Sequence, residues 1–134
     1  MPPKEFRAYC ETCCIVHDAT WLANSGYAIH PRDGLTKIDG SESTHKLTEV
    51  RATGHRDCQK NPVFHGDILR YKNPKYPKKI QPLHLVLWDA KRASFILRTK
   101  HGVNGIDASF HKYPERWQVI ASFFTHPDLV GFTL

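Results

Sequence analysis

A chain of 134 residues, 40% of them hydrophobic, can bury one core, and its length favours a single domain over residues 1–134. Its apolar runs are all far shorter than about twenty residues, which excludes a transmembrane helix, and its opening segment lacks the apolar centre of a secretory signal. We therefore expect a cytoplasmic protein. A net charge of +6, from 19 basic and 13 acidic residues, excludes a DNA mimic and indicates an acidic partner, either nucleic acid or a protein complex.

In chain order, the sequence predicts short strands separated by turns, because apolar and aromatic runs are bounded by Gly, Pro, Asn and Asp. The predicted strands cover residues 5–9, 27–30, 46–52, 68–71, 83–89, 93–98, 109–113 and 117–124. Residues 17–23 fit either a strand or a short helix, and residues 100–107 form a glycine-rich loop. Three prolines in residues 72–82 exclude a central strand or helix there. Residues from 126 onward indicate a terminal turn or a short helix.

Turns every eight to twelve residues or so are typical of a mainly β protein, here a β-rich α+β fold built on a small, barrel-like antiparallel sheet. The N-terminal part, residues 1–62, carries the cysteines, and we expect it to be stapled by zinc. The C-terminal part, about residues 63–134, has the more regular pattern of a small β-barrel.

The segment of residues 53–69 organises the prediction. It contains a turn at residues 53–54, a polar hairpin tip, a tight corner at residues 65–67 and a new strand that begins at Ile68. Two glycines and one proline fix where its backbone bends.

Three segments carry a resemblance to a known family. The matching residues are Phe6, Arg7, Ala8 and Tyr9 at the opening; Thr53, Gly54, Asp57, Val63, Phe64, Gly66, Asp67, Ile68 and Leu69 in the middle; and Trp117, Val119, Ile120, Pro127 and Leu129 at the close. They follow the patterns K-F-R-A-W, T-G-x-x-D-x-x-G-x-x-I-Y-x-G-D-I-V and W-x-V-I-G-N-I-Y-x-N-P-x-L-L. With them the chain resembles the YopX family of phage and prophage proteins over nearly its whole length.

This resemblance implies a β-rich, barrel-like fold and a phage or mobile-element origin, hence a place in the host cell cytoplasm. It implies no enzymatic activity, since a fold does not fix a function. In three places the chain departs from the family. Lys60 replaces a glycine, Ala121-Ser122 replaces a Gly-Asn pair, and the cysteine cluster at residues 10–14 is not a general family feature. The cluster indicates a metal adaptation in this member.

The four cysteines, Cys10, Cys13, Cys14 and Cys58, should be reduced in a cytoplasmic protein. Cys10-x-x-Cys13 and His55-x-x-Cys58 are two pairs separated in sequence, which is how structural zinc sites are assembled. We predict that Cys10, Cys13, His55 and Cys58 bind a structural Zn²⁺. Cys14-x-x-His17 is a competing second pair, and free cysteines in a turn and a hairpin tip are the alternative to any metal site.

The loop of residues 70–82 interleaves cations with aromatic rings, a composition that suits contact with phosphates and bases or with an acidic protein face. A solvated, proline-stiffened connection would look the same. The predicted binding residues are Arg70, Lys72, Lys75, Tyr76, Lys78 and Lys79.

The sequence contains no nucleotide-binding loop, nucleophile elbow or paired carboxylates, so we expect a binding protein and not an enzyme. The first functional hypothesis is a counter-defence inhibitor (an anti-CRISPR protein) that binds a host defence complex such as a type II CRISPR effector nuclease. It rests on the phage resemblance. The alternative is a nucleic-acid-binding protein in phage gene regulation or replication, acting through the basic loop.

Overall fold

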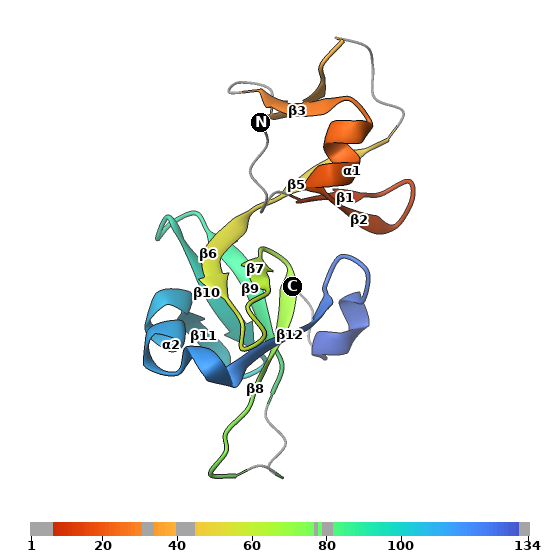
Figure 1. Cartoon of the computed structure of the whole chain (residues 1–134). Coiled ribbons are helices and arrows are strands. Elements are labelled where there is room, and N and C mark those ends of the chain that lie inside the picture. The colour runs from red at the N-terminus through yellow and green to blue at the C-terminus, as the bar shows by residue number, and fades with distance from the viewer. Residues whose placement is uncertain (1–6, 31–33, 40–44, 77, 79–81, 132–134) are drawn as a thin grey trace. The chain divides into compact units, whose positions relative to one another are not determined.

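The computed structural model describes residues 7–30, 34–39, 45–76, 78 and 82–131. The chain divides into two compact units, Met1–Arg51 and Ala52–Leu134, and each is described by itself (Figure 1). The boundary predicted from the sequence, between the N-terminal and C-terminal parts at residues 62–63, lies later in the chain than this division after Arg51. Residues 52–62 join the second unit because β6 (Ala52–Arg56) pairs with β7 (Pro62–Phe64).

The first unit is built on a three-stranded antiparallel sheet in which β1 (Arg7–Cys10) lies between β2 (Ile15–Asp18) and β5 (Leu47–Val50). A short helix, α1 (Ala19–Asn24), follows β2 directly. Residues 17–23, for which the sequence fits either a strand or a short helix, are therefore part strand and part helix. The Asp18 carboxylate starts this helix by accepting a hydrogen bond from the backbone N–H of Trp21 at 2.9 Å. A hairpin of β3 (Tyr27–His30) and β4 (Gly34–Lys37) completes the unit.

The core of the first unit is small. Among the described residues of this unit, Ala8, Leu22 and Tyr27 form a buried cluster, with Trp21 and Leu47 among the partly buried side chains packed against it, and Cys10 and Val50 are buried as well. A unit of this length with a small core is one in which a cross-link such as a bound metal adds much to stability.

The second unit contains a five-stranded antiparallel sheet of order β11-β10-β9-β8-β12. Its strands are β8 (Asp67–Tyr71), β9 (His84–Asp89), β10 (Ser94–Thr99), β11 (Gly102–Gly105) and β12 (Trp117–Ser122). Its helical segments are α2 (Ile106–Lys112) and two 3-10 helices, η1 (Pro114–Arg116) and η2 (Pro127–Val130).

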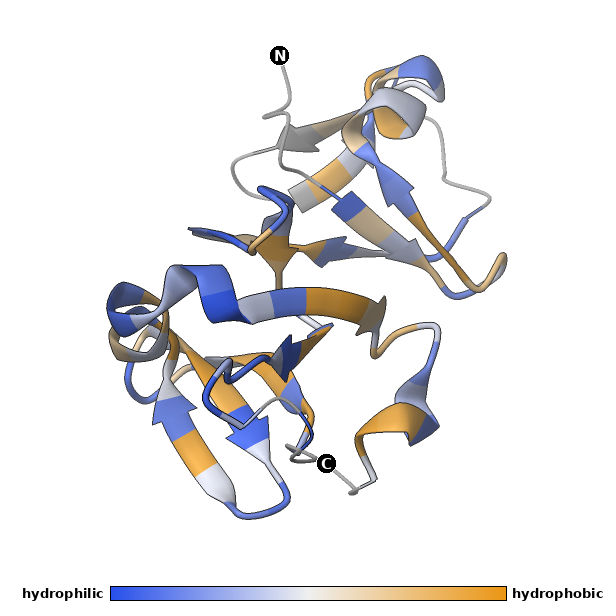
Figure 2. Cartoon of the chain, turned by 60° about the horizontal axis from the view of Figure 1, so that its bottom comes forward, coloured by the Kyte–Doolittle hydropathy of each residue, from blue (hydrophilic) through white to orange (hydrophobic). Residues whose placement is uncertain are grey.

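Both faces of this sheet are apolar, because successive side chains along a strand point to opposite faces. Leu69 and Val86 pack with Ile106 and Phe110 of α2 on one face, whereas Ile68 and Leu85 belong to a second cluster with Val130. Hydrophobic residues accordingly lie mainly on the strands and hydrophilic ones on the connections (Figure 2).

The strand-rich, antiparallel character predicted from the sequence is confirmed. In the described part of the chain, however, the sheet is open: β11 and β12 are its edges and do not pair, so no closed barrel is found there. The predicted strand at residues 109–113 is wrong, because these residues lie mostly in α2. There Ile106 and Phe110, four positions apart, fall on one helical face and are buried. None of the helices in the described segments is long and apolar enough to cross a membrane.

Two buried carboxylates hold the turns of the organising segment. Asp57, only 3% exposed, accepts hydrogen bonds on Oδ1 from the backbone N–H groups of Gln59 and Asn61, both at 2.9 Å. Its Oδ2 accepts another from Val119 of β12 at 3.0 Å. Asp67 accepts one from the backbone N–H of Phe64 at 2.8 Å. The residues that carry the family resemblance here have structural roles.

Gly66 gives a sharp test of this packing. Its φ is +87°, and a Cβ added there would lie 2.4 Å from Cε2 of Phe124. Gly66→Ala should therefore combine left-handed strain with overpacking and lower the free energy of unfolding by about 2–4 kcal/mol. Gly54 has a similar φ of +86° with nothing within 4 Å of such a Cβ. Gly54→Ala should cost only about 1–2 kcal/mol. Urea denaturation compares the two variants, and equal losses would contradict the close approach of Phe124.

Candidate metal centre and basic sheet end

Three potential metal ligands converge in the first unit. The Nδ1 atom of His45 lies 3.4 Å from Sγ of Cys10 and 3.3 Å from Sγ of Cys13. The ligand atoms of these three residues all lie within 4.8 Å of one another. Cys10 is fully buried, whereas the side chains of Cys13 and His45 are partly exposed.

Strand pairing explains this convergence. Cys10 ends β1 and is paired with Leu47 of β5, so His45, two residues before Leu47, projects on the same side of the sheet. The backbone N–H of Glu11 extends this pairing by donating to the Lys46 carbonyl at 3.0 Å. Cys13 returns to the site through a tight turn, closed by a 2.8 Å hydrogen bond from the Cys14 N–H to the Cys10 carbonyl.

The turn also prepares the sulfur atoms for a metal. Burial raises the pKa of the Cys10 thiol, but hydrogen bonds from the Cys13 N–H, the Cys13 thiol and His45 outweigh it and lower the pKa to about 7. The Cys13 N–H lies 3.2 Å from the Cys10 sulfur. The pKa of the Cys13 thiol is raised, because this thiol is hydrogen-bonded to the Cys10 sulfur and is itself partly desolvated. The Cys10 thiol is therefore the easier of the two to deprotonate, and both thiols must lose their protons when a cation binds.

The distances fit a small tetrahedral ion. With Zn–S bonds of about 2.3 Å and Zn–N bonds of about 2.0 Å, the S···N edge of a tetrahedron measures about 3.5 Å. The two observed S···N distances are 3.4 and 3.3 Å. The three side chains can therefore bind one metal ion with little rearrangement.

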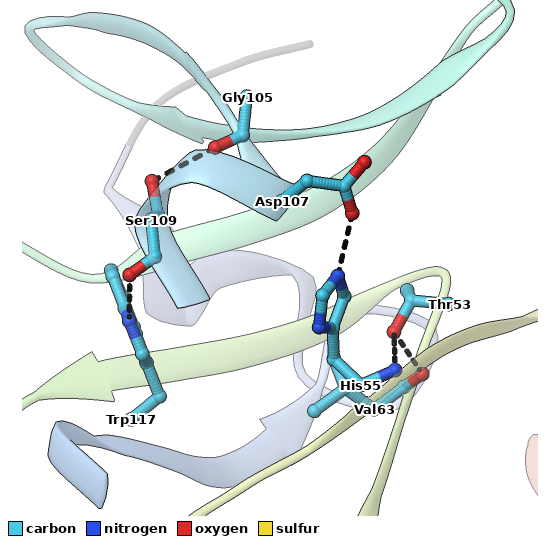
Figure 3. Close-up of polar contacts among 7 residues, drawn as sticks. All are labelled: Thr53, His55, Val63, Gly105, Asp107, Ser109 and Trp117. Atoms are coloured by element: carbon cyan, nitrogen blue, oxygen red, sulfur yellow. Dashed lines mark hydrogen bonds and ion pairs between the residues drawn. The ribbon is translucent and has the colours of Figure 1, made fainter. Parts of the chain in front are cut away.

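Two of the four predicted ligands, Cys10 and Cys13, are in this group, which among the described residues includes neither His55 nor Cys58. His55 and Cys58 belong to the second unit. There Nε2 of His55 lies 2.7 Å from Oδ1 of Asp107 (Figure 3), and its ring packs against Phe110. Cys58 donates its backbone N–H to the carbonyl of Trp117 at 2.8 Å. The third member of the group is His45, which the sequence prediction missed.

One signal could have identified His45. It stands immediately before the predicted strand of residues 46–52, which is the partner of the strand that ends at Cys10. The pairing register, and not a local motif, brings it level with the cysteine.

Four of the six predicted binding residues, Lys72, Lys75, Tyr76 and Lys78, lie at one end of the five-stranded sheet, in the connection from β8 to β9. Lys72, Lys75 and Lys78 are exposed, and Tyr76 is 54% exposed with the Lys75 ammonium 6.0 Å from its ring centre. Arg70 is exposed on β8 itself. Lys79 lies outside the described residues.

Other cations lie at the same end. Lys72 donates its backbone N–H to the Arg116 carbonyl at 2.7 Å, which places the start of β12 beside the loop. The Arg116 guanidinium stands 3.7 Å from the ring centre of Tyr113 and donates to the Tyr71 hydroxyl at 2.9 Å. The antiparallel register of β9 and β10 also brings the turn with Lys100 to this end. The Lys112 ammonium lies 5.6 Å from the ring centre of Tyr113. We call this group the basic sheet end; its members are Tyr71, Lys72, Lys75, Tyr76, Lys78, Lys100, Lys112, Tyr113 and Arg116.

Cations and tyrosines outnumber acids on this surface. Exposed Glu115, next to Arg116, is the acidic residue within the segments that form it. Such a surface attracts phosphates or carboxylates, and its rings offer flat faces for stacking.

The comparisons with known proteins bear on the fold. No family model matches the sequence, and no curated protein matches it. Among solved structures, the chain is similar to the crystal structure of protein EF1440 from Enterococcus faecalis, with a TM-score of 0.61 and 16% sequence identity over 94% of this chain and 96% of that one. At this identity the likeness shows a shared fold and nothing more.

Proposed function

We propose that this protein is a non-catalytic binding protein, with an N-terminal unit held by zinc and a basic sheet end that contacts an acidic partner. The observation that carries the binding role is the run of exposed lysines in the connection from β8 to β9, where Lys75 lies against Tyr76 and the backbone of Lys72 is hydrogen-bonded to Arg116, whose guanidinium stacks on Tyr113. These groups come from separate segments of the second unit, so the fold and not one basic run of sequence creates the surface.

Zinc is the metal that this ligand set favours. Two thiolates and an imidazole are soft and borderline ligands, which select Zn²⁺ over oxygen-preferring Mg²⁺ or Ca²⁺. The site closes the small first unit, which is the place where a structural metal contributes most to folding.

The resemblance to phage proteins supports a counter-defence role. In this proposal the basic sheet end docks on a host defence complex, such as a type II CRISPR effector nuclease, near its guide or target nucleic acid. A second function, direct nucleic-acid binding in phage gene regulation or replication, is favoured by Tyr76, since a half-exposed ring beside a lysine can stack on a base.

Charge reversal tests the surface. The double variant Lys75→Glu/Lys78→Glu should weaken partner binding at least about tenfold. For nucleic acid, the slope of the logarithm of the binding constant against the logarithm of the salt concentration should fall in magnitude by about two, because about two fewer counterions are released. Lys60→Glu with Lys91→Glu makes the same change in net charge at exposed positions in other turns and should leave binding within about threefold.

Two measurements separate the functions. Gel shifts with single-stranded DNA and RNA at two salt concentrations test direct binding to nucleic acid. Retention of a purified effector nuclease, with its guide RNA, on the immobilised protein tests the counter-defence role. Retention of the nuclease without binding to free nucleic acid would favour the inhibitor. Equal effects of the two double variants in both assays would reject the basic sheet end as the contact surface.

A further inference from the structure

The metal centre has a fourth candidate ligand on the same face of the sheet. In the antiparallel pairing of β1 with β2, Ala8 is opposite His17 and Cys10 is opposite Ile15. Paired residues project to the same side, as do residues two apart on a strand, so His17 and Cys10 share one face on neighbouring rungs. His45 reaches this face from the other side of β1, through the pairing with β5.

The His17 ring lies close to the site and has an unused nitrogen. Its Nε2 is buried, and the described residues provide it with no hydrogen-bond partner. A buried polar atom left in this way is unfavourable and calls for an explanation. The ring stacks on Trp21, with centroids 3.6 Å apart, and its centroid lies 6.4 Å from that of His45.

We infer that His17 is the fourth metal ligand, which completes a site of two cysteines and two histidines with Cys10, Cys13 and His45. Two imidazoles bound to one tetrahedral ion have ring centres about 5 Å apart. His17 lies outside the group whose ligand atoms are within 4.8 Å of one another, and its ring centre is 6.4 Å from that of His45. Coordination therefore requires the His17 ring to move toward the site by more than about 1 Å, which would also give its buried nitrogen a partner. This inference rests on the proposed zinc site and specifies how that site is closed.

Cys14 is the other residue that could be the fourth ligand, but its side chain does not lie in the group of ligand atoms. Its side chain is exposed, its φ is +58°, and its thiol donates to the Glu11 carbonyl at 3.6 Å. With His17 in place the ion has four protein ligands and no open position for water, which is the arrangement of a structural zinc site and not of a catalytic one.

Cobalt substitution tests the inference. The wild-type protein should bind Co²⁺ with the intense visible bands of a four-coordinate ion bearing two thiolates. His17→Phe keeps the stack on Trp21 but removes the nitrogen, so the bands should weaken and the Kd for Zn²⁺ should rise more than the 10–100-fold or so that a lost supporting group costs. His84→Phe is the matched control, because His84 in the second unit also has a buried nitrogen, Nδ1, without a partner in the described segments.

A second measurement on the wild-type protein makes the result independent of whether a variant folds. Long-range ¹H–¹⁵N correlation spectra should show the Nε2 signal of His17 and the Nδ1 signal of His45 shifting together on addition of Zn²⁺. If the wild type binds no metal, the zinc proposal itself fails. If it binds metal while His17→Phe keeps the same spectrum and affinity, or while the His17 nitrogens do not shift, the zinc proposal stands and the fourth ligand is wrong.

Discussion

Removal of the metal should unfold the first unit and leave the second folded. The buried core of the first unit is small, and binding of structural zinc contributes about 10–16 kcal/mol of apparent free energy in small domains. The sheet of the second unit has two apolar clusters of its own, one on each face. Loss of the ion therefore removes the main source of stability from Met1–Arg51 alone.

The tryptophans report on the two units separately. Trp21 packs against the core of the first unit, whereas the indole N–H of Trp117 donates to the Ser109 carbonyl in the second, at 3.2 Å (Figure 3). In ¹H–¹⁵N spectra, a chelator should collapse the indole signal of Trp21 toward its random-coil position and leave that of Trp117 in place.

Single cysteine variants then identify the ligands. Cys10→Ser should reproduce the effect of the chelator and reduce the zinc content from about one ion per chain to nearly none. Cys58→Ser should retain both metal and fold, since Cys58 is not in the group of close ligand atoms. Loss of zinc from the Cys58→Ser protein would instead support the ligand set predicted from the sequence. A wild-type protein that is folded without metal would contradict the proposal of a structural zinc site.

Asp57→Ala should be among the most destabilising single changes in the second unit. It removes the buried carboxylate that accepts from three backbone N–H groups: those of Gln59 and Asn61, which are exposed residues, and that of Val119, which is partly buried. An unsatisfied buried group costs about 1–3 kcal/mol, and water can reach the two exposed donors, so we expect a loss of about 2–4 kcal/mol in the free energy of unfolding.

Two comparisons isolate the cause. Asp57→Asn keeps one carbonyl oxygen and should lose roughly half as much. Asp128→Ala, at an exposed carboxylate, should change stability by less than about 0.5 kcal/mol. Chemical denaturation of the three variants measures this order. A value for Asp57→Ala near that of Asp128→Ala would contradict the link between the β6–β7 turn and β12.

The sequence predicted best where side-chain alternation and turn residues agree. The strands around residues 68–71, 83–89 and 93–98 are confirmed as β8, β9 and β10, because alternation reports which faces of a strand are buried. It failed at α2, where seven residues with Ile106 and Phe110 as the buried pair give too short a pattern to separate a helix from a strand.

The site was half predictable for a related reason. Cys10 and Cys13 lie in one turn, so their spacing already indicates a metal. His45 is 35 residues away from Cys10, and its position depends on the register of two strands, which no local pattern specifies. His17 was a candidate through the pair Cys14-x-x-His17, but only the pairing of Ala8 with His17 places it on the same face of the sheet as Cys10.

The separation between Cys10 and His45 has a thermodynamic consequence. An ion that joins side chains 35 residues apart restricts the unfolded chain as a disulfide of that span does, an effect of about 4 kcal/mol in the loop-entropy description. Unlike a disulfide, this closure needs no oxidant and is reversed by any stronger chelator. The abundance of the first unit in its native form would then follow the supply of free zinc and not the thiol–disulfide balance around it.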